Sequence, residues 1–171
     1  MTRSTEVVIS HLEMTTPPAA NTPAGPDGAA VQQETGPQAA ALAGWLYRTV
    51  GADWHWRDRL AWSDAQWQED LDRAGSELWT ARQNGAIAGY FELVRHDADV
   101  DIKYFGLLPD AIGRGIGRWL LSVAIERAWA LGPGKVTVNT CTLDSPRALP
   151  NYLARGFRVV RREHELRELP A

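Results

Sequence analysis

The stretch from Tyr104 to Leu121 carries three glycines at every second position, just where a helical sequence begins. A short apolar run ends at a proline, and Gly113, Gly115 and Gly117 follow. The first N–H groups of a helix have no partner inside it, and the positive end of the helix dipole lies there, so this pattern predicts a phosphate site or, alternatively, only a tight turn. Both common nucleotide patterns fail, because the Walker loop requires lysine and the dinucleotide fingerprint requires glycine where Arg118 stands.

Aromatic side chains gather in a second segment, GADWHWRDRLAW, which runs from Gly51 to Trp62. Large aromatics suit both ligand pockets and cores. Trp54 and Trp56 are candidates for either role, whereas Trp62 and Trp67 are expected to pack the core. The histidines are scattered without the spacing of a metal site, so no metal is predicted. They are His11, His55, His96 and His164.

The composition is that of an ordinary globular domain. The chain has 171 residues, of which 44% are hydrophobic and 23% charged, which favours a single domain over residues 1–171. The net charge of −3 gives no electrostatic case for a nucleic-acid partner. The single cysteine, Cys141, cannot form an internal disulfide. Since no apolar run is long enough to cross a bilayer and the N-terminus lacks a signal-peptide core, we expect a cytoplasmic protein without a membrane partner.

Local patterns place these candidates on secondary-structure elements. Residues 5–14 are rich in β-branched side chains and are predicted to form a strand. Residues 15–37 are rich in Pro, Ala and Gly and are predicted to form a loop. Helical spacing predicts a helix over 38–50, and Ser63 with Gln66 forms a capping-box pattern that opens a second helix.

The rest of the chain predicts a sheet crossed by helices. Asn84-Gly85 separates the strand-like runs 76–82 and 86–94, which is a strong hairpin signal, and another strand follows over 100–108. The predicted order is strand, two helices, three strands, helix, strand, helix, strand, which is an α+β fold with one strand–helix–strand crossover. The later elements are a helix over 114–131, a strand over 135–141, a helix over 145–155 and a strand over 157–166.

Two motifs in this order resemble those of the GNAT acetyltransferase superfamily. The first is Gln/Arg-x-x-Gly-x-Gly/Ala, which here reads IGRGIG, with Ile112 in place of the polar residue. The second is a helix with Asn-x-x-Ala followed by Tyr-x-x-x-Gly-Phe, with Ser145 in place of the asparagine. Two separated motifs on the right elements are more specific than either alone, and the resemblance is strong from about Gly89 to Val160. The matching positions of the second motif are Ala148, Tyr152, Gly156 and Phe157.

The resemblance implies a fold and a co-substrate. The fold is mixed α/β, with a central, mostly antiparallel sheet, helices on both faces, and fourth and fifth strands that splay apart. The co-substrate is acetyl-CoA, whose pyrophosphate is wrapped in this family by main-chain N–H groups of the glycine loop. The implied coenzyme A contacts are Phe105, Gly106, Leu107, Ile112, Gly113, Arg114, Gly115, Ile116, Gly117, Arg118, Asp144, Ser145 and Tyr152.

The resemblance also implies catalytic roles. Acyl transfer from a thioester to an amine needs a stabiliser for the developing oxyanion and a proton for the leaving thiolate. By position, the backbone N–H of Leu107 is the oxyanion donor, and Tyr152 matches the tyrosine that protonates the thiolate. The alternative for Tyr152 is that it only packs beside Phe157.

The general base has two candidates. Asp101 lies where some family members keep a catalytic glutamate, and its shorter side chain would act through a water. Glu92 on the preceding strand is the second candidate. Both residues have an alternative as ordinary charged positions of a strand, and many members of the family rely on a water chain instead of a dedicated base.

In this family the acceptor amine lies over the first two helices and their connection. Here that connection supplies Trp54, His55 and Trp56 as expected substrate contacts. Trp54 and Trp56 suit an aromatic or cation-holding pocket, although they also suit packing of the helices on the sheet. Cys141 is expected to pack in the fifth strand, near the acyl site.

These observations predict an acetyl-CoA-dependent N-acetyltransferase. The acceptor is expected to be a primary amine on a small molecule that attacks directly in a ternary complex. Two alternatives remain: a coenzyme A-binding sensor that has lost catalysis, which the departures at Ile112 and Ser145 would suit, and a protein-lysine acetyltransferase. A homodimer is a further option, since dimers are common in this superfamily.

Overall fold

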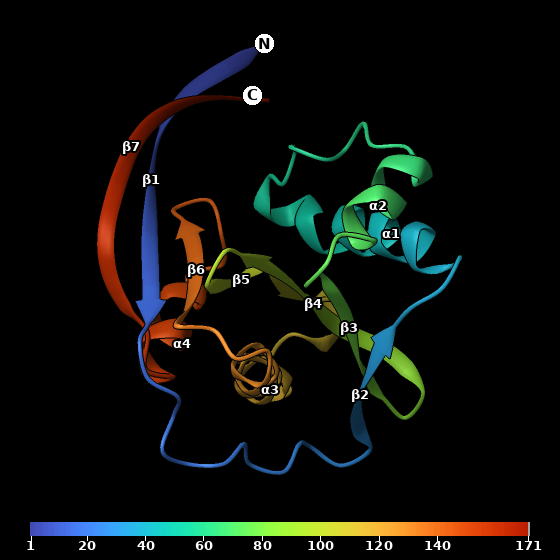
Figure 1. Cartoon of the computed structure of the whole chain (residues 1–171). Coiled ribbons are helices and arrows are strands. Elements are labelled where there is room, and N and C mark those ends of the chain that lie inside the picture. The colour runs from blue at the N-terminus through green and yellow to red at the C-terminus, as the bar shows by residue number, and fades with distance from the viewer. Residues whose placement is uncertain (171) are drawn as a thin grey trace.

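A computed structural model of the chain describes residues 1–170 and contains a seven-stranded sheet in the order β2-β3-β4-β5-β6-β1-β7 (Figure 1). Neighbouring strands are antiparallel except for β5 and β6, which are parallel. The strands are β1 (Thr2–Met14), β2 (Ala29–Glu34), β3 (Glu77–Gln83), β4 (Ala86–His96), β5 (Asp99–Leu107), β6 (Lys135–Cys141) and β7 (Arg158–Pro170). The helices are α1 (Ala39–Gly51), α2 (Asp64–Leu71), α3 (Ile116–Ala130) and α4 (Ala148–Ala154), with short 3₁₀ turns η1 (Ala52–Trp54) and η2 (Pro109–Ala111).

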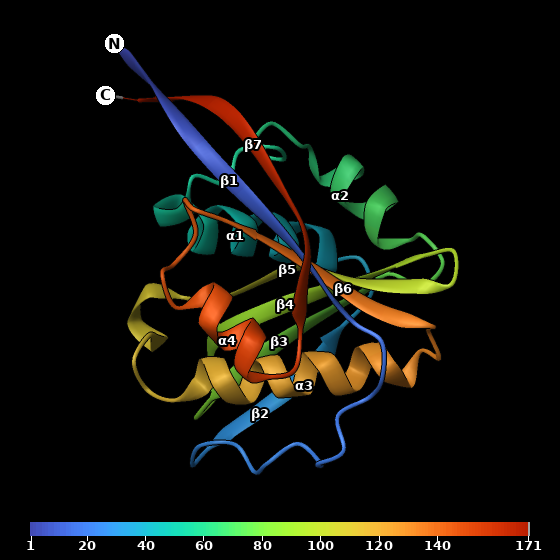
Figure 2. The same ribbon diagram turned by 90° about the vertical axis from the view of Figure 1, so that its left-hand side faces the viewer.

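Helices cover both faces of the sheet. The α1–α2 pair lies on one face, and α3 and α4 lie on the other (Figures 1 and 2). Each face has its own buried cluster, one built around Tyr47 and Trp67 and the other around α3. The predicted mixed, mostly antiparallel fold with helices on both faces is confirmed. None of the described helices is long and apolar enough to cross a membrane.

Local signals in the sequence account for several element boundaries. Asn84 and Gly85 form the β3–β4 turn with φ of 52° and 85°, the left-handed conformation that a tight two-residue hairpin requires. Ser63 Oγ accepts a hydrogen bond from the Gln66 backbone N–H, and the Gln66 side chain accepts one from the Ser63 N–H. Both predictions are therefore confirmed.

The prediction of a loop over residues 15–37 is wrong for residues 29–34, which form the edge strand β2. This strand pairs antiparallel with β3 from Ala29–Gln83 to Glu34–Leu78. Its sequence, AAVQQE, has weak strand propensity, so pairing with β3 decides its conformation. Part of the preceding loop also contacts α3, because the Thr22 hydroxyl lies 3.3 Å from the Ser122 carbonyl oxygen.

The strands β5 and β6 pair over only a short part of their length. Their register runs from Asp99–Lys135 to Asp101–Thr137, and the later residues of the two strands are not paired with each other. Beyond that point β5 continues along β4 as far as Leu107, and β6 continues along β1 as far as Cys141. The predicted splay of the fourth and fifth strands, counted without β2, is therefore present.

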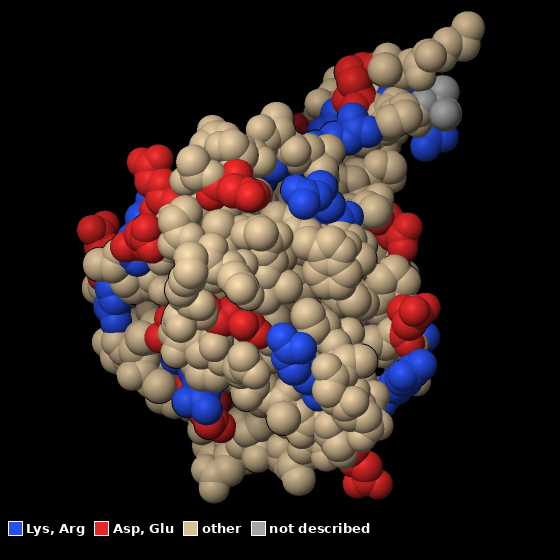
Figure 3. All heavy atoms as spheres, turned by 90° about the vertical axis from the view of Figure 1, so that its right-hand side faces the viewer, with Lys and Arg blue, Asp and Glu red and all other residues tan. Residues whose placement is uncertain are grey.

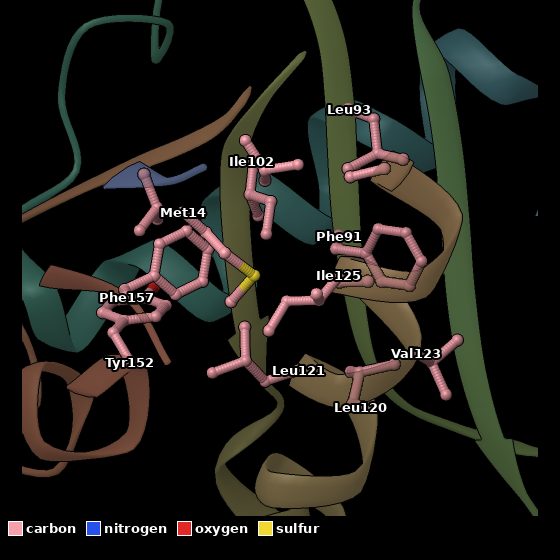
Figure 4. Packing of buried hydrophobic residues seen from close by; sticks show 14 of the residues in the cluster. Met14, Phe91, Leu93, Ile102, Leu120, Leu121, Val123, Ile125, Tyr152 and Phe157 are labelled. Carbon is pink, nitrogen blue, oxygen red and sulfur yellow. The ribbon is translucent and has the colours of Figure 1, made fainter. Parts of the chain in front are cut away.

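The helix α3 is fixed under the sheet by apolar side chains on more than one side. Leu120, Leu121 and Ile125 are almost fully buried, and Figure 4 shows them directed into the same cluster as Ile102 of β5. Complete burial of a leucine or isoleucine side chain contributes about 1.5–3 kcal/mol. This packing holds the N-terminus of α3 in place next to the end of β5.

The strands β1 and β7 form a long two-stranded ribbon at the edge of the sheet. They pair from Thr2–Pro170 to Glu13–Arg158, with one irregularity near His11. The ends of this ribbon project beyond the rest of the molecule (Figures 2 and 3).

The close approach of β4 to β5 gives the first prediction. A Cβ at Gly89 would lie 2.7 Å from the Gly106 carbonyl oxygen, which is backbone and cannot move aside. Gly89→Ala should lower the free energy of unfolding by about 1–3 kcal/mol in urea denaturation. Gly134→Ala is the control, because its Cβ would make only an ordinary contact, at 3.8 Å from the Ala98 oxygen. Equal stability of the two variants would contradict this account.

Candidate active site

A cavity of about 730 Å³ is lined by residues from both sides of the splay between β5 and β6. One end is bounded by the glycine loop, the start of α3, and α4. The other end is bounded by the connection after α1 and by β7. Most of the residues predicted for the site line this cavity: Trp54, His55, Trp56, Phe105, Gly106, Leu107, Ile112, Gly113, Gly115, Gly117, Arg118, Asp144, Ser145 and Tyr152.

The glycine loop is built around two left-handed residues. Gly113 and Gly115 have φ of 85° and 79°, and a Cβ at either position would meet nothing within 4 Å. Glycine is therefore favoured at these two positions by the left-handed backbone conformation, and a side chain there would project into open space. Gly115 is the N-cap of α3 and supplies no side-chain cap, so the first N–H groups of the helix have no side chain bound to them there.

These features suit the start of α3 to binding an anion. The helix dipole and the uncapped N–H groups favour a negative group, and the Arg118 side chain borders the same part of the cavity. Two predicted contacts lie elsewhere. Ile116 is 1% exposed and belongs to the core, and Arg114 does not line the cavity. The loop can hold a phosphate without the polar side chain that Ile112 replaces.

The turn between β6 and α4 is organised by Asp144. Its Oδ2 accepts hydrogen bonds from the Thr140 hydroxyl at 2.6 Å and from the Cys141 backbone N–H at 2.9 Å. Ser145 Oγ accepts a weaker bond from the Arg147 N–H at 3.3 Å. The two predicted contacts therefore line the cavity while their side chains also hold the turn that starts α4.

The end of β5 offers free backbone donors to the cavity. The Leu108 N–H donates to the Ala88 carbonyl of β4 at 2.8 Å. Because N–H groups alternate in direction along a strand, the N–H of Leu107 points away from β4, toward the unpaired edge. That edge borders the cavity through Phe105, Gly106 and Leu107. A carbonyl oxygen placed in the splay would meet a donor there.

Tyr152 of α4 stands at the wall of the cavity. Its ring packs edge-on against Phe105 and Phe157, at centroid distances of 6.4 and 6.0 Å. Figure 4 shows the contact with Phe157. Burial raises the pKa of the Tyr152 phenol well above its ordinary value, and the Asp144 and Asp101 carboxylates add to the shift. Because of this raised pKa, the hydroxyl is protonated at neutral pH. It makes no hydrogen bond to another described residue, so it borders the cavity as a free donor.

The two carboxylates predicted as alternative bases do not line this cavity. Asp101 Oδ1 accepts a hydrogen bond from the Thr137 hydroxyl at 2.7 Å and borders a smaller cavity beside His11 and Arg161. Glu92 is 1% exposed and lies within the protein. The placement of these residues gives no support to either as the group that takes a proton directly from an amine.

Glu92 belongs instead to a buried ion cluster around Arg59. Arg59 Nη1 lies 3.3 Å from Glu92 Oε1 and 3.1 Å from Asp70 Oδ2, and all three side chains are buried. Burial raises the pKa of Glu92 to about 7; Arg59 opposes the shift and Asp70 adds to it. The guanidinium also lies over three rings, at 4.3 Å from Trp62, 4.8 Å from Tyr104 and 5.1 Å from Trp67.

This ion cluster fixes the end of the cavity bounded by the α1–α2 connection, where the sequence predicts the acceptor. Arg59 follows directly after the cavity-lining residues 54–58, and its backbone N–H lies 3.2 Å from the Tyr47 hydroxyl oxygen. Its contacts therefore tie the α1–α2 connection to α1, α2 and β4 at once. The sequence contains no signal for this role, because an arginine in a polar, aromatic segment resembles any exposed arginine.

Aromatic rings form one wall of the acceptor side. Trp56 and Tyr47 each lie 5.2 Å from Tyr104 between ring centroids, and Trp54 lies beside them in the lining. Asp58, a sequence candidate for holding an ammonium group, also lines the cavity. Several other lining residues could not be predicted from the sequence, because they come from separate elements that only the fold brings together. They are Tyr47, Arg57, Lys103, Tyr104, Asn139, Arg147 and Arg167.

Cys141, at the end of β6, is partly buried and borders the cavity near the splay. Burial raises the pKa of its thiol, so the thiol is protonated at neutral pH and is a poor nucleophile. Among residues 1–170, no group of three or more His, Cys, Asp or Glu side chains is placed to hold a metal ion.

Comparisons with known proteins agree with this geometry. The model of the acetyltransferase (GNAT) family matches residues 45–157. A search of curated proteins gives no match. Among solved structures, a GCN5-related N-acetyltransferase from Sphaerobacter thermophilus has a TM-score of 0.73 and 17% identity, and the match covers 98% of this chain and 52% of that one.

Two further solved structures share the fold. A GCN5-related N-acetyltransferase from Kribbella flavida has a TM-score of 0.62 and 15% identity, covering 91% of this chain and 56% of that one. An aminoglycoside acetyltransferase from an uncultured soil metagenomic sample, in complex with sisomicin, has a TM-score of 0.61 and 14% identity, covering 75% and 88%. The chain thus spans about half the length of the two GCN5-related structures.

The buried ion cluster gives the second prediction. Between pH 4.5 and about 7 the folded protein holds a proton on Glu92 that the unfolded chain has released, so the stability that this group contributes falls as pH rises. Gln cannot titrate, so the stability of Glu92→Gln relative to the wild type should rise across this window. The rise should be at most about 3 kcal/mol and should level off above it.

Urea denaturation at a series of pH values measures this difference. Glu69→Gln, which changes an exposed glutamate on α2, is the control and should follow the wild type at every pH. A Glu92→Gln profile parallel to that of the wild type would show that Glu92 does not titrate in this window.

Proposed function

Because the chain belongs to the acetyltransferase (GNAT) family, we propose that it is an N-acetyltransferase that transfers an acetyl group from acetyl-CoA to a primary amine of a small molecule. The observation that carries this proposal is the continuity of the cavity. It runs from an anion site at the start of α3, through the splay of β5 and β6, to an aromatic wall on the far side. A thioester arm lying in the splay would bring its carbonyl between the coenzyme side and the acceptor side.

The coenzyme end of the cavity has the residues that coenzyme A would need. Its pyrophosphate would face the uncapped N–H groups of α3 and the left-handed glycines, and Arg118 would supply positive charge. Arg147, at the start of α4, also lines this end and adds a second cation. Neither role requires the polar side chain that Ile112 replaces.

The reaction proposed is direct attack in a ternary complex. The neutral amine attacks the thioester carbonyl carbon, the C–N bond forms, and the C–S bond breaks to release the thiolate. The Leu107 N–H donates to the oxyanion that develops on the carbonyl oxygen. Tyr152 donates a hydrogen bond to the leaving sulfur and so stabilises the negative charge that develops there. Its raised pKa disfavours complete transfer of the phenol proton, so the coenzyme leaves as a hydrogen-bonded thiolate that takes its proton from water.

The proton of the attacking amine leaves on the acceptor side. Asp58 and His55 line the cavity there and are exposed to solvent, so a water can pass the proton outward. This route involves neither Asp101 nor Glu92. It agrees with a mechanism without a single dedicated base.

The two alternatives are less well supported. A coenzyme A sensor without catalysis would not need a free phenol bordering the cavity beside the splay. A protein-lysine acetyltransferase would need an open, acid-lined groove, whereas aromatic rings wall this site and Asp58 is the one acid at its acceptor end within residues 1–170. Incubation with acetyl-CoA and an amine panel, followed by mass spectrometry and thiol detection, tests the proposal. Thiol release no higher than hydrolysis with every amine would contradict it.

The third prediction concerns Tyr152. Tyr152→Phe removes the hydroxyl but keeps the packing against Phe105 and Phe157, so kcat should fall about a hundredfold or more. The Kd for acetyl-CoA should change little. Tyr90→Phe is the matched control, because Tyr90 is also buried and does not line the cavity. If steady-state kinetics give both variants the same kcat, Tyr152 has no chemical role.

The fourth prediction concerns the anion site. Gly115→Ala and Gly132→Ala each place a side chain at a left-handed position, with φ of 79° and 73°, where a Cβ would meet nothing within 4 Å. Both should therefore lose a similar stability, of about 1–2 kcal/mol. By calorimetry, only Gly115→Ala should weaken coenzyme A binding, because Gly132 lies beyond the other end of α3. Equal affinity of the two variants for coenzyme A would show that the phosphate groups bind elsewhere.

A further inference from the structure

The charges on the acceptor side of the cavity are mostly positive. Arg118 and Arg147 belong to the coenzyme end, and Asp144 is held by its hydrogen bonds within the β6–α4 turn. On the acceptor side, three cations then face one carboxylate, within the described residues. The cations are Arg57, Lys103 and Arg167, and the carboxylate is Asp58.

Arg167 is the most constrained of these cations. It reaches the cavity from β7, and its side chain is 38% exposed, whereas Arg57 and Lys103 are exposed to solvent. Within residues 1–170 its one side-chain hydrogen bond runs from Nε to Glu165, whose carboxylate forms an ion pair with the guanidinium but does not line the cavity. A guanidinium has further N–H donors on its two Nη atoms, which remain available for a planar oxyanion.

Arg167 also lies close to the place of reaction. Its charge opposes the upward shift that burial gives the pKa of the Cys141 thiol, and Cys141 stands at the end of β6, on the splay. The Asp58 carboxylate, on the α1–α2 connection, in turn helps to raise the pKa of the Arg167 guanidinium. A cation and an anion thus face the acceptor side from β7 and from the α1–α2 connection.

We propose that the acceptor is an amine that also carries a carboxylate, with Arg167 holding the carboxylate and the wall of Trp56, Tyr104 and Tyr47 contacting an apolar or aromatic body. The simplest compounds of this class are apolar α-amino acids. The inference rests on the proposed function, since it identifies the acceptor of that same site. The second cation, Arg57, extends the same positive field at the mouth of the cavity.

The charge pattern favours this class over the alternatives. An acceptor with several ammonium groups would place positive charge against Arg57, Lys103 and Arg167, with one carboxylate to offset them. A carboxylate matches one guanidinium in charge and in planar shape, whereas a doubly charged phosphate would lie against Asp58 as well.

Matched substrate pairs test the proposal in the full chain. Each pair consists of an amino acid and the amine that lacks only its carboxylate: phenylalanine and phenethylamine, tryptophan and tryptamine, leucine and 3-methylbutylamine. Acetyl-CoA turnover should show kcat/KM at least about tenfold higher for the amino acid in the best pair. In Arg167→Gln this preference should fall to near parity, mainly through a higher KM for the amino acid, while kcat/KM for the amine stays within about twofold.

Arg162→Gln is the control variant, because Arg162 lies on the same strand, is exposed and does not line the cavity. It should keep the wild-type preference. Turnover of amines without a preference for the carboxylate, or an equal loss for both members of a pair in Arg167→Gln, would overturn this inference and leave the proposed function standing. Absence of turnover with every amine and amino acid would overturn both.

Discussion

The separation of β5 from β6 is the constraint on which the rest of the structure depends. After Asp101 and Thr137 the two parallel strands lose their shared hydrogen bonds, and the backbone of β5 is left with donors that no neighbouring strand satisfies. An unpaired strand edge inside a sheet is costly unless water or a ligand reaches it. The cavity supplies that access, so one irregularity of the sheet creates both the space of the site and its free N–H groups.

Two rigid supports hold the open splay from opposite sides. On the coenzyme side, α3 is packed into the core by Leu120, Leu121 and Ile125, so its uncapped start lies at a fixed distance from the end of β5. On the acceptor side, Arg59 ties the α1–α2 connection to the buried carboxylates of Asp70 and Glu92. A buried ion cluster of this kind adds little stability in itself, because desolvation offsets the attraction between the charges. Its effect here is to fix the position of a loop that has no regular structure.

The sequence predicted those parts of the fold and of the site where one backbone conformation requires a particular residue type, or where two residues close in the chain interact. The left-handed glycines, the Asn84-Gly85 turn and the Ser63 cap each carry a residue type that the conformation requires. The edge strand β2 could not be predicted, because its pairing with β3 decides its conformation and its own propensity is weak. The roles of Arg59 and Arg167 could not be predicted for the same reason, because the residues that share a buried cluster or a cavity with them lie far away in the chain. Sequence could propose Glu92 and Asp101 as bases, but their distance from the cavity depends on how the strands face their neighbours.

The ribbon of β1 and β7 places one proposed substrate contact outside the segment that matches the family model. The segment that matches the family model ends at residue 157, and β7 begins at Arg158, so Arg167 lies outside that segment. Under the proposed function, the donor site and the proposed carboxylate contact thus lie in separate segments that meet only in the folded sheet. Substitutions on β7 can alter which molecule is accepted while the glycine loop, the splay and Tyr152 stay as they are.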